Sequence, residues 1–145
     1  MILDTSAIIA IIANEPARER LTHALAAAPA RRVSAATLVE IDAVTTRRDD
    51  GSLSRRAHRL LRAFEVETVP FDATQAAIAA RAYREYGRGT GHAAALNLGD
   101  CFSYALALHL DEPLLFVGDD FPARTYSKPS LSEPADATSR PSPPK

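Results

Sequence analysis

Short apolar runs and amphipathic stretches alternate along the first 126 residues of this chain. A short apolar run predicts a buried strand, whereas apolar residues spaced three or four apart predict a helix. The runs predict strands at 1–3, 32–34, 67–70 and 113–117. The periodic stretches predict helices at about 7–13, 17–28, 36–48, 55–64, 73–86 and 97–111. Because strands that alternate with helices are typical of right-handed βαβ units, we expect an α/β fold with a central parallel sheet.

Polar residues next to these stretches predict where two of the helices begin. Thr5 or Ser6 can cap the first helix, because a hydroxyl oxygen accepts a hydrogen bond from a free amide at a helix start. Asp72 and Gln75 have the spacing of a capping box, in which each side chain bonds the backbone of the other residue. We therefore expect the helix that ends at Tyr86 to begin at Asp72.

The composition changes after residue 126. Residues 127–145 contain five prolines and five serines and little apolar material. Such a segment buries too little apolar surface to offset the entropy lost on folding. The sequence therefore predicts one folded domain at 1–126 and a C-terminal tail at 127–145 that is disordered or extended.

Composition also excludes several kinds of function. A single cysteine excludes an internal disulfide and a cysteine-based zinc site. Both lysines, Lys128 and Lys145, lie in the tail, which excludes a lysine mechanism in the predicted domain. The chain has 17 basic and 18 acidic residues, so any charge-driven function depends on local clustering. With no export signal and no apolar run long enough for a membrane span, we expect a cytoplasmic protein without membrane contact.

Five acidic residues are the candidates for chemistry. Ligands of an open parallel sheet bind at the carboxyl ends of its strands. Asp4 follows the first predicted strand, and Asp119 and Asp120 follow the last one. Glu40 lies in the helix after the second strand, and Asp100 lies in the first turn of the helix before the last strand. Their joint placement predicts that they converge on one edge of the sheet.

Each of these acids also has a purely structural interpretation. Asp4 can cap a helix, and Glu40 can be a solvated residue on a helix surface. Asp100 stands three residues after Asn97 and can complete a capping box. Asp119 and Asp120 are of a type common in turns.

If the carboxylates do converge, their mutual repulsion requires protons or cations nearby. Carboxylate oxygens without a set of Cys or His ligands favour hard divalent ions, Mg²⁺ or Mn²⁺. These ions bind phosphate oxygens and lower the pKa of a bound water molecule. The acidic set therefore indicates metal-assisted phosphoryl chemistry.

Four segments of the chain resemble the motifs of PIN-domain ribonucleases, in particular the VapC-type toxins of toxin–antitoxin pairs. The segments are Ile2–Ala7, Ser34–Glu40, Asn97–Ala105 and Leu115–Phe121, and they occur in the order and at the spacing of the family. The resemblance covers about residues 1–126. It implies a three-layer α/β/α domain, a homodimer and an endoribonuclease that depends on Mg²⁺ or Mn²⁺. It also implies an RNA substrate and a cognate VapB-type antitoxin.

The resemblance assigns roles to the acidic residues. It implies that Asp4 and Asp100 are direct metal ligands. Glu40 would hold the metal directly or through water and help to orient the attacking water. Asp120 is favoured as the fourth acid, since the acid of the family commonly precedes the Phe, and Asp119 is the second choice.

Two hydroxyl residues and several arginines complete the expected site. By resemblance, Thr5 or Ser6 would contact metal-bound water or a substrate phosphate. Arginines on three helices either guide the RNA backbone or are solvated residues, and the sequence favours neither interpretation. They are Arg47, Arg48, Arg55, Arg56, Arg59, Arg62, Arg81, Arg84 and Arg88. The helices around Leu21–Leu25 and Val44–Leu61 are the expected apolar contact surfaces for the antitoxin.

A non-catalytic PIN-like module that binds RNA or a protein partner is the alternative. A phospho-acceptor receiver domain fits poorly, because the predicted domain contains no lysine. A phosphatase with an aspartyl nucleophile typically has a second Asp two residues after the first, and Ser6 stands there. Cleavage of RNA with Mn²⁺ and with a chelator distinguishes the enzyme from the module.

Overall fold

A four-stranded parallel sheet forms the centre of the molecule in a computed structural model that describes residues 1–48, 51–118 and 121. The strands are β1 (Ile2–Leu3), β2 (Arg32–Ser34), β3 (Glu67–Val69) and β4 (Leu114–Leu115). Their order across the sheet is β3-β2-β1-β4, and every neighbouring pair is parallel. The predicted parallel sheet is confirmed, although β4 is shorter than the predicted strand at 113–117.

Six helices surround the sheet in the described part of the chain. They are α1 (Thr5–Ile12), α2 (Arg18–Ala27), α3 (Ala35–Arg48), α4 (Ser52–Ala63), α5 (Ala73–Tyr86) and α6 (Leu98–Leu110). Each predicted helix is present, and α4 begins three residues earlier than predicted. Gly51 permits this early start, because the residue before α4 has a φ of 90°, which favours glycine. None of the described helices is long and apolar enough to cross a membrane.

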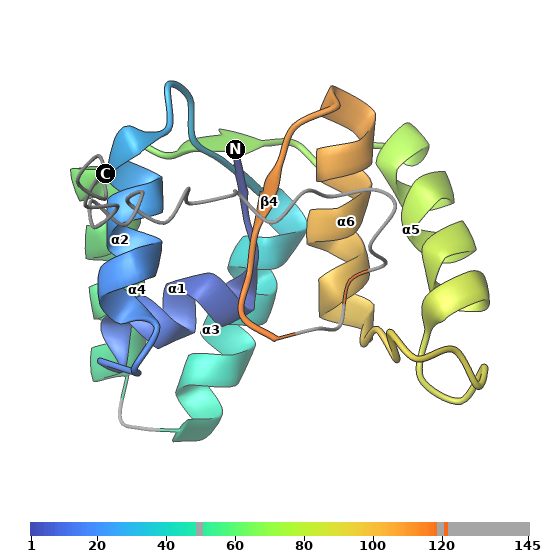
Figure 1. Ribbon diagram of the computed structural model, residues 1–145, viewed down its shortest axis with the longest axis horizontal. Coiled ribbons are helices and arrows are strands. Elements are labelled where there is room, and N and C mark those ends of the chain that lie inside the picture. Colours follow the sequence, from blue (N-terminus) through green and yellow to red (C-terminus); the bar gives the residue numbers. More distant parts are fainter. Residues whose placement is uncertain (49–50, 119–120, 122–145) are drawn as a thin grey trace, which may run out of the picture.

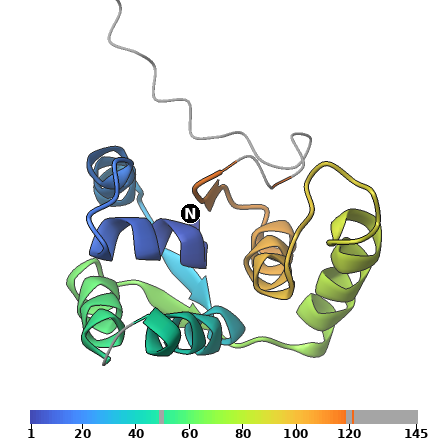
Figure 2. The same cartoon turned by 90° about the horizontal axis from the view of Figure 1, so that it is seen from below.

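The helices form two layers on opposite sides of the sheet. Figure 1 shows α1, α2 and α4 on one side of the strands and α6 on the other side, with α5 packed against the outer face of α6. Figure 2 shows the same separation from a perpendicular direction. The three-layer α/β/α architecture is thus confirmed.

Alternate strand residues supply the two cores. Leu3 and Leu115 belong to the apolar cluster that includes α1, α2 and α4. Ile2 and Leu114 belong to the second cluster, which includes α5 and α6. Successive side chains of a strand point to opposite faces of a sheet, so even these two-residue strands contribute to both cores. Both residues of β1 and both residues of β4 are apolar, because each of these strands is buried on both faces.

The helix start at Asp72 is only partly as predicted. The Asp72 carboxylate accepts a hydrogen bond from the Gln75 amide at 2.9 Å, as an N-cap should. The Gln75 side chain, however, is buried and donates to the carbonyl oxygen of Pro70 at 2.8 Å. The Gln75 side chain therefore does not make the reciprocal bond of a capping box, which would join it to the Asp72 backbone amide.

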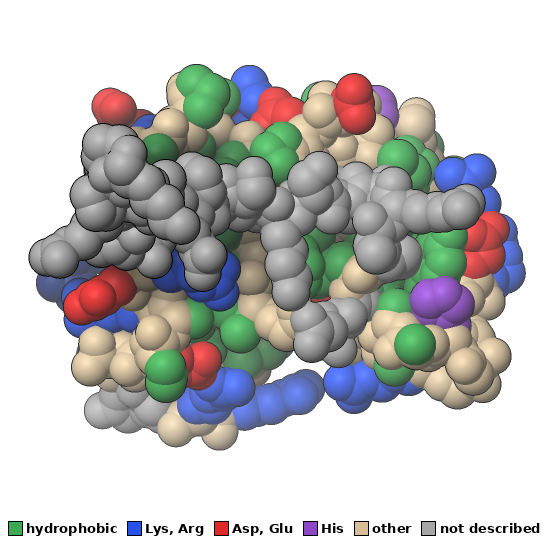
Figure 3. Space-filling model, viewed as in Figure 1, with side chains coloured by type: hydrophobic (Ala, Val, Ile, Leu, Met, Phe, Trp, Pro, Cys, Tyr) green, Lys and Arg blue, Asp and Glu red, His purple; other side chains and the backbone are tan. Residues whose placement is uncertain are grey.

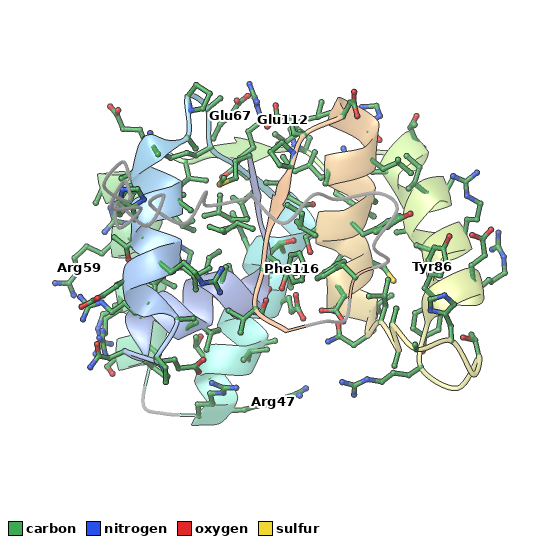
Figure 4. All side chains as sticks on the ribbon, in the orientation of Figure 1. Arg47, Arg59, Glu67, Tyr86, Glu112 and Phe116 are labelled. Atoms are coloured by element: carbon green, nitrogen blue, oxygen red, sulfur yellow. The ribbon has the colours of Figure 1, made fainter. Side chains whose placement is uncertain are left out.

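The amino end of the sheet holds a group of ion pairs. Arg32 bonds Glu67 at 2.8 Å and also pairs with Glu112, whose other oxygen lies 2.5 Å from the terminal amino group of Met1. Figure 4 shows Glu67 and Glu112 at the upper edge of the view and Arg47 at the lower edge. These acids are paired with cations and so have a structural function.

Candidate active site

Asp4 lies at the carboxyl end of β1, where the strand passes directly into α1. It is the N-cap of α1, and its Oδ2 accepts the amide of Ser6 at 2.9 Å. The prediction that Thr5 or Ser6 caps this helix is therefore wrong. Thr5 is already the first helical residue, because the helix starts immediately after the strand and Asp4 has the extended backbone of a cap.

Three donors hold the Asp4 carboxylate. The Ser6 hydroxyl donates to Oδ2 at 2.6 Å, in addition to the Ser6 amide. The hydroxyl of Ser103, on α6, donates to Oδ1. Only 1% of Asp4 is exposed, so these bonds replace the water that an ionised carboxylate otherwise requires.

Glu40 lies on α3 next to Asp4 and is half-buried. Its Oε2 accepts a hydrogen bond from the Thr5 hydroxyl at 2.6 Å. Burial raises the pKa of Glu40 above its usual value; the Thr5 bond opposes this effect, and the negative charge of Asp4 adds to it. The neighbourhood of Glu40 therefore favours uptake of a proton or a cation.

The carboxyl group of Glu40 lies against the backbone of α6 at Gly99. A methyl group on Gly99 would overlap the carboxyl carbon and both carboxyl oxygens of Glu40. Gly99 itself is buried in the first turn of α6. Glycine at this position thus leaves the space that Glu40 occupies.

Asp100 completes a capping box at the start of α6. Its Oδ2 accepts the Asn97 amide at 2.7 Å, and the Asn97 side chain accepts the Asp100 amide at 2.8 Å. The structural interpretation of Asp100 is thus confirmed. This capping role is compatible with a functional role, because Asp100 also lines the cavity described next.

Asp4, Glu40 and Asp100 line one cavity of about 280 Å³. They reach it from the end of β1, from α3 and from the start of α6. Glu15 and Arg48 are the other charged residues of its wall. The remaining lining residues are Thr5, Ser6, Ile9, Val44, Asn97 and Val117. The expected convergence of acids at the carboxyl edge of the sheet therefore occurs for these three residues.

The last two acidic candidates, Asp119 and Asp120, lie outside the described residues. The chain leads toward them past the cavity, since Val117 lines its wall. The Val117 amide donates to the Ser6 hydroxyl at 3.1 Å, and that hydroxyl donates in turn to Asp4. Ser6 therefore connects the segment after β4 to Asp4.

Sequence reasoning missed three residues of this site. Glu15 lies in the connection from α1 to α2, away from any strand end, and nothing in the sequence distinguishes it. Gly99 carries a usable signal, because glycine within a helix usually has a packing or functional reason. Ser103 carries another, since it is a hydroxyl among the buried apolar residues of α6.

The donor chemistry of the cavity fits a hard divalent cation. Its acidic wall offers carboxylate oxygens, and its described lining contains neither Cys nor His. Burial raises the pKa of the nearby Cys101 to about 12, which leaves that thiol protonated. Within residues 1–48, 51–118 and 121, no three Asp, Glu, His or Cys side chains are close enough to hold a metal ion by themselves. The side chains present thus suit such a cation by type, without forming a finished ligand set.

Comparison with known proteins identifies the family of the chain. Residues 1–125 match the sequence profile of the PIN domain. The chain belongs to the PIN-domain family. Within this family it is similar to Ribonuclease VapC42 of Mycobacterium tuberculosis, with 52% identity over 121 residues that cover 83% of this chain and 92% of the relative. Ribonuclease VapC28 of the same organism is 46% identical over 121 residues, which cover 83% of this chain and 91% of that protein. This PIN domain is thus of the VapC type.

Solved structures share the PIN fold at lower sequence identity. Mycobacterium tuberculosis VapC20, described as a sarcin-ricin loop cleaving toxin, has a TM-score of 0.66 and 18% identity. The match covers 87% of this chain and 95% of that one. A toxin–antitoxin complex from Klebsiella pneumoniae has a TM-score of 0.59 and 19% identity, and the match covers 84% of this chain and 90% of that one.

Proposed function

We propose that this PIN domain is the toxin of a toxin–antitoxin pair and cleaves RNA phosphodiester bonds with the help of Mg²⁺ or Mn²⁺. One observation carries the proposal: Asp4, Glu40 and Asp100 come from three separate elements and line one cavity at the carboxyl edge of the sheet. The VapC relatives, named as ribonucleases, support the reaction class. The acidic wall supports the choice of a hard cation.

Asp4 and Asp100 are the residues that would hold the cation, together with Glu40. Asp120, or Asp119 in its place, would complete the set, although both lie outside the described residues. When bound, a divalent cation supplies charge stabilisation at the phosphate and lowers the pKa of a water molecule. The donors around Asp4 orient its carboxylate, because each of its oxygens accepts at least one hydrogen bond.

Glu40 is the residue we assign to accept the proton of the attacking water. Its raised pKa makes it a stronger base than an exposed glutamate at the same pH. The Thr5 hydroxyl fixes Oε2 of Glu40 at 2.6 Å, and Oε1 lies against the backbone of Gly99, so both contacts restrict the carboxyl group. We therefore assign Thr5 to orienting Glu40, and Ser6 to orienting Asp4, in addition to the contact with metal-bound water or a substrate phosphate that the resemblance implies.

Arg48 is the arginine that we assign to the RNA near the cavity. Arg47 and Arg48 are both exposed at the end of α3, and of the two it is Arg48 that lines the cavity wall, while Arg47 lies at the lower edge of the view in Figure 4. Figure 3 shows Arg side chains along this lower edge, where the carboxyl ends of the strands lie. A phosphate backbone that approaches an acidic cavity requires such cations.

A second cavity suits a segment of the antitoxin. It has a volume of about 440 Å³ and combines apolar with cationic walls: Ile11, Ile12, Leu60, Ala63, Arg18, Arg56 and Arg59. An amphipathic segment with apolar and acidic side chains would complement it. Leu21 and Leu25 themselves are completely buried in the core, so an antitoxin on the helix around them would contact its other residues.

Two exposed apolar residues support a homodimer. Val39 is 71% exposed and Leu98 is 60% exposed. Val39 precedes Glu40 on α3, and Leu98 precedes Gly99 on α6, so each is adjacent in sequence to a residue of the site. A second copy of the chain would cover these two apolar side chains. Light scattering tests the proposal, because replacing both residues by Ser should convert a dimer to a monomer.

The decisive experiment measures cleavage of total bacterial RNA with Mn²⁺ and with EDTA, followed by sequencing of the new ends. The Asp4→Asn variant keeps an N-cap side chain for α1 and removes a cavity carboxylate. Its matched control is Asp72→Asn, which changes the N-cap of α5 in the same way, away from the cavity. We expect cleavage to require Mn²⁺, to be lost in Asp4→Asn and to persist in Asp72→Asn.

Other outcomes contradict parts of the proposal. Cleavage that survives both EDTA and Asp4→Asn would refute the metal mechanism. RNA that is bound but not cut by the unmodified chain would favour the non-catalytic module instead.

A further inference from the structure

The α6 helix contains one serine hydroxyl group, that of Ser103, in the middle of a buried and largely apolar segment. Ser103 is completely buried, and it is surrounded in sequence by the buried residues Cys101, Tyr104, Ala105, Leu106 and Ala107. A hydroxyl in such a core is costly unless it forms a hydrogen bond. The bond that Ser103 makes is to the Oδ1 atom of Asp4, 99 positions away in the sequence.

We propose that Ser103 is a positioning residue that sets the orientation of the Asp4 carboxylate in the cavity. This inference rests on the proposed function, since it concerns how the same site is arranged. Ser103 lies three residues after Asp100, so both residues are on neighbouring positions of one helix face. The α6 helix therefore positions Asp4 through Ser103, and it also contributes Asp100 from its own first turn.

The direction of the hydrogen bond follows from the chemistry of the two groups. An ionised carboxylate can only accept, so the Ser103 hydroxyl is the donor. Its single proton has one other acceptor among the described residues, the carbonyl oxygen of Asp100 at 3.3 Å. The approach to Asp4 is much closer, and a bond to a charged acceptor is the stronger of the two.

Ser103 controls a degree of freedom that Ser6 does not. Both donors of Ser6, its amide and its hydroxyl, bond Oδ2 of Asp4. The terminal torsion of an aspartate is broad, so a carboxylate held by one oxygen can still rotate. Among the described residues, Ser103 is the donor that holds the other oxygen. Its hydroxyl therefore fixes the plane of the carboxylate.

The test compares two variants that remove this donor with one that removes a different buried hydroxyl. Ser103→Ala deletes the hydroxyl, and Ser103→Cys replaces it with a weak donor of similar size. Thr45→Val is the control, because Thr45 is equally buried on α3 but donates to the carbonyl oxygen of Ile41 in its own helix, at 2.7 Å. The measurements are Mn²⁺ affinity by calorimetry, kcat and KM for RNA cleavage, and the melting temperature of each full-length protein.

We expect both Ser103 variants to bind Mn²⁺ about tenfold more weakly and to lose about tenfold in kcat, with KM little changed. Thr45→Val should lower the melting temperature without changing the Mn²⁺ affinity or kcat. If one Ser103 variant fails to fold, the other supplies the measurement.

Unchanged Mn²⁺ affinity and kcat in a folded Ser103 variant would overturn the inference while leaving the proposed function intact. If the unmodified chain neither cleaves RNA nor binds Mn²⁺, the proposed function fails and this inference fails with it. If the unmodified chain binds Mn²⁺ but cuts no RNA, the calorimetric comparison alone decides the role of Ser103.

Discussion

Replacement of Gly99 by Ala should inactivate the enzyme without unfolding it. The new methyl group would overlap the carboxyl group of Glu40, which must retreat by roughly 2 Å to reach an ordinary contact distance of about 3.5–4 Å. Such a shift breaks the 2.6 Å hydrogen bond from Thr5 to Glu40. Since an error of about 1 Å in a reacting group can cost about 100-fold, we expect kcat to fall at least that far.

The effect of Gly99→Ala on stability should be small, because two terms oppose each other. Alanine in place of glycine lowers the conformational entropy of the unfolded chain, which stabilises a protein by about 0.4–1 kcal/mol. The lost bond between Thr5 and the Glu40 carboxylate costs about 1.5–3 kcal/mol at most, and less here because Glu40 is only half-buried. The free energy of unfolding should therefore change by no more than about 1–2 kcal/mol.

The assay combines initial cleavage rates at saturating RNA with urea denaturation, in two backgrounds. In Glu40→Ala, a methyl group on Gly99 has no carboxylate to displace, so the double variant should be more stable than Glu40→Ala by up to about 1 kcal/mol. Cleavage by Gly99→Ala at the unmodified rate would refute the reasoning. The reasoning would also be refuted if Gly99→Ala destabilised the unmodified chain and Glu40→Ala equally, because the methyl group would then collide with something other than Glu40.

Three further predictions concern charge and domain extent. Glu40→Gln should stabilise the protein in a chelating buffer at neutral pH. Burial raises the pKa of Glu40 in the folded state above its usual 4.5, so ionisation of Glu40 lowers the free energy of unfolding as the pH rises through that pKa. Urea denaturation should show this gain vanish below pH 4.5, and a gain independent of pH would contradict the assignment. Arg48→Ala should raise KM several-fold and reduce the slope of log KM against log salt by about one. Arg59→Ala, at the other cavity, should leave KM unchanged, and equal effects of both variants would argue against a local role for Arg48. A chain that ends at residue 126 should keep the melting temperature and cleavage rate of the full chain, whereas a lower melting temperature would show that the tail belongs to the folded unit.

Local signals account for the elements that could be predicted. The apolar run before Asp4 predicted β1, and the periodic stretch after Ser34 predicted α3. These predictions succeed because the repeat of a strand or helix depends on neighbouring residues alone. The two errors at helix starts, at Thr5 and at Gln75, arose where more than one side chain could satisfy the same backbone groups. Tertiary packing decides such a competition, as the bond of Gln75 to Pro70 shows.

The sequence by itself determined the parallel α/β order of elements, the position of Asp4 at the end of the first strand, and the positions of Glu40 and Asp100 on helices. Only the tertiary structure decided that these three acids share a cavity, that Gly99 leaves room for Glu40 and that Ser103 donates to Asp4. The physical reason is the distance along the chain. Strand and helix patterns are local, but the contact of α6 with β1 and α3 depends on how two packed layers meet across the sheet, which no short stretch of sequence specifies.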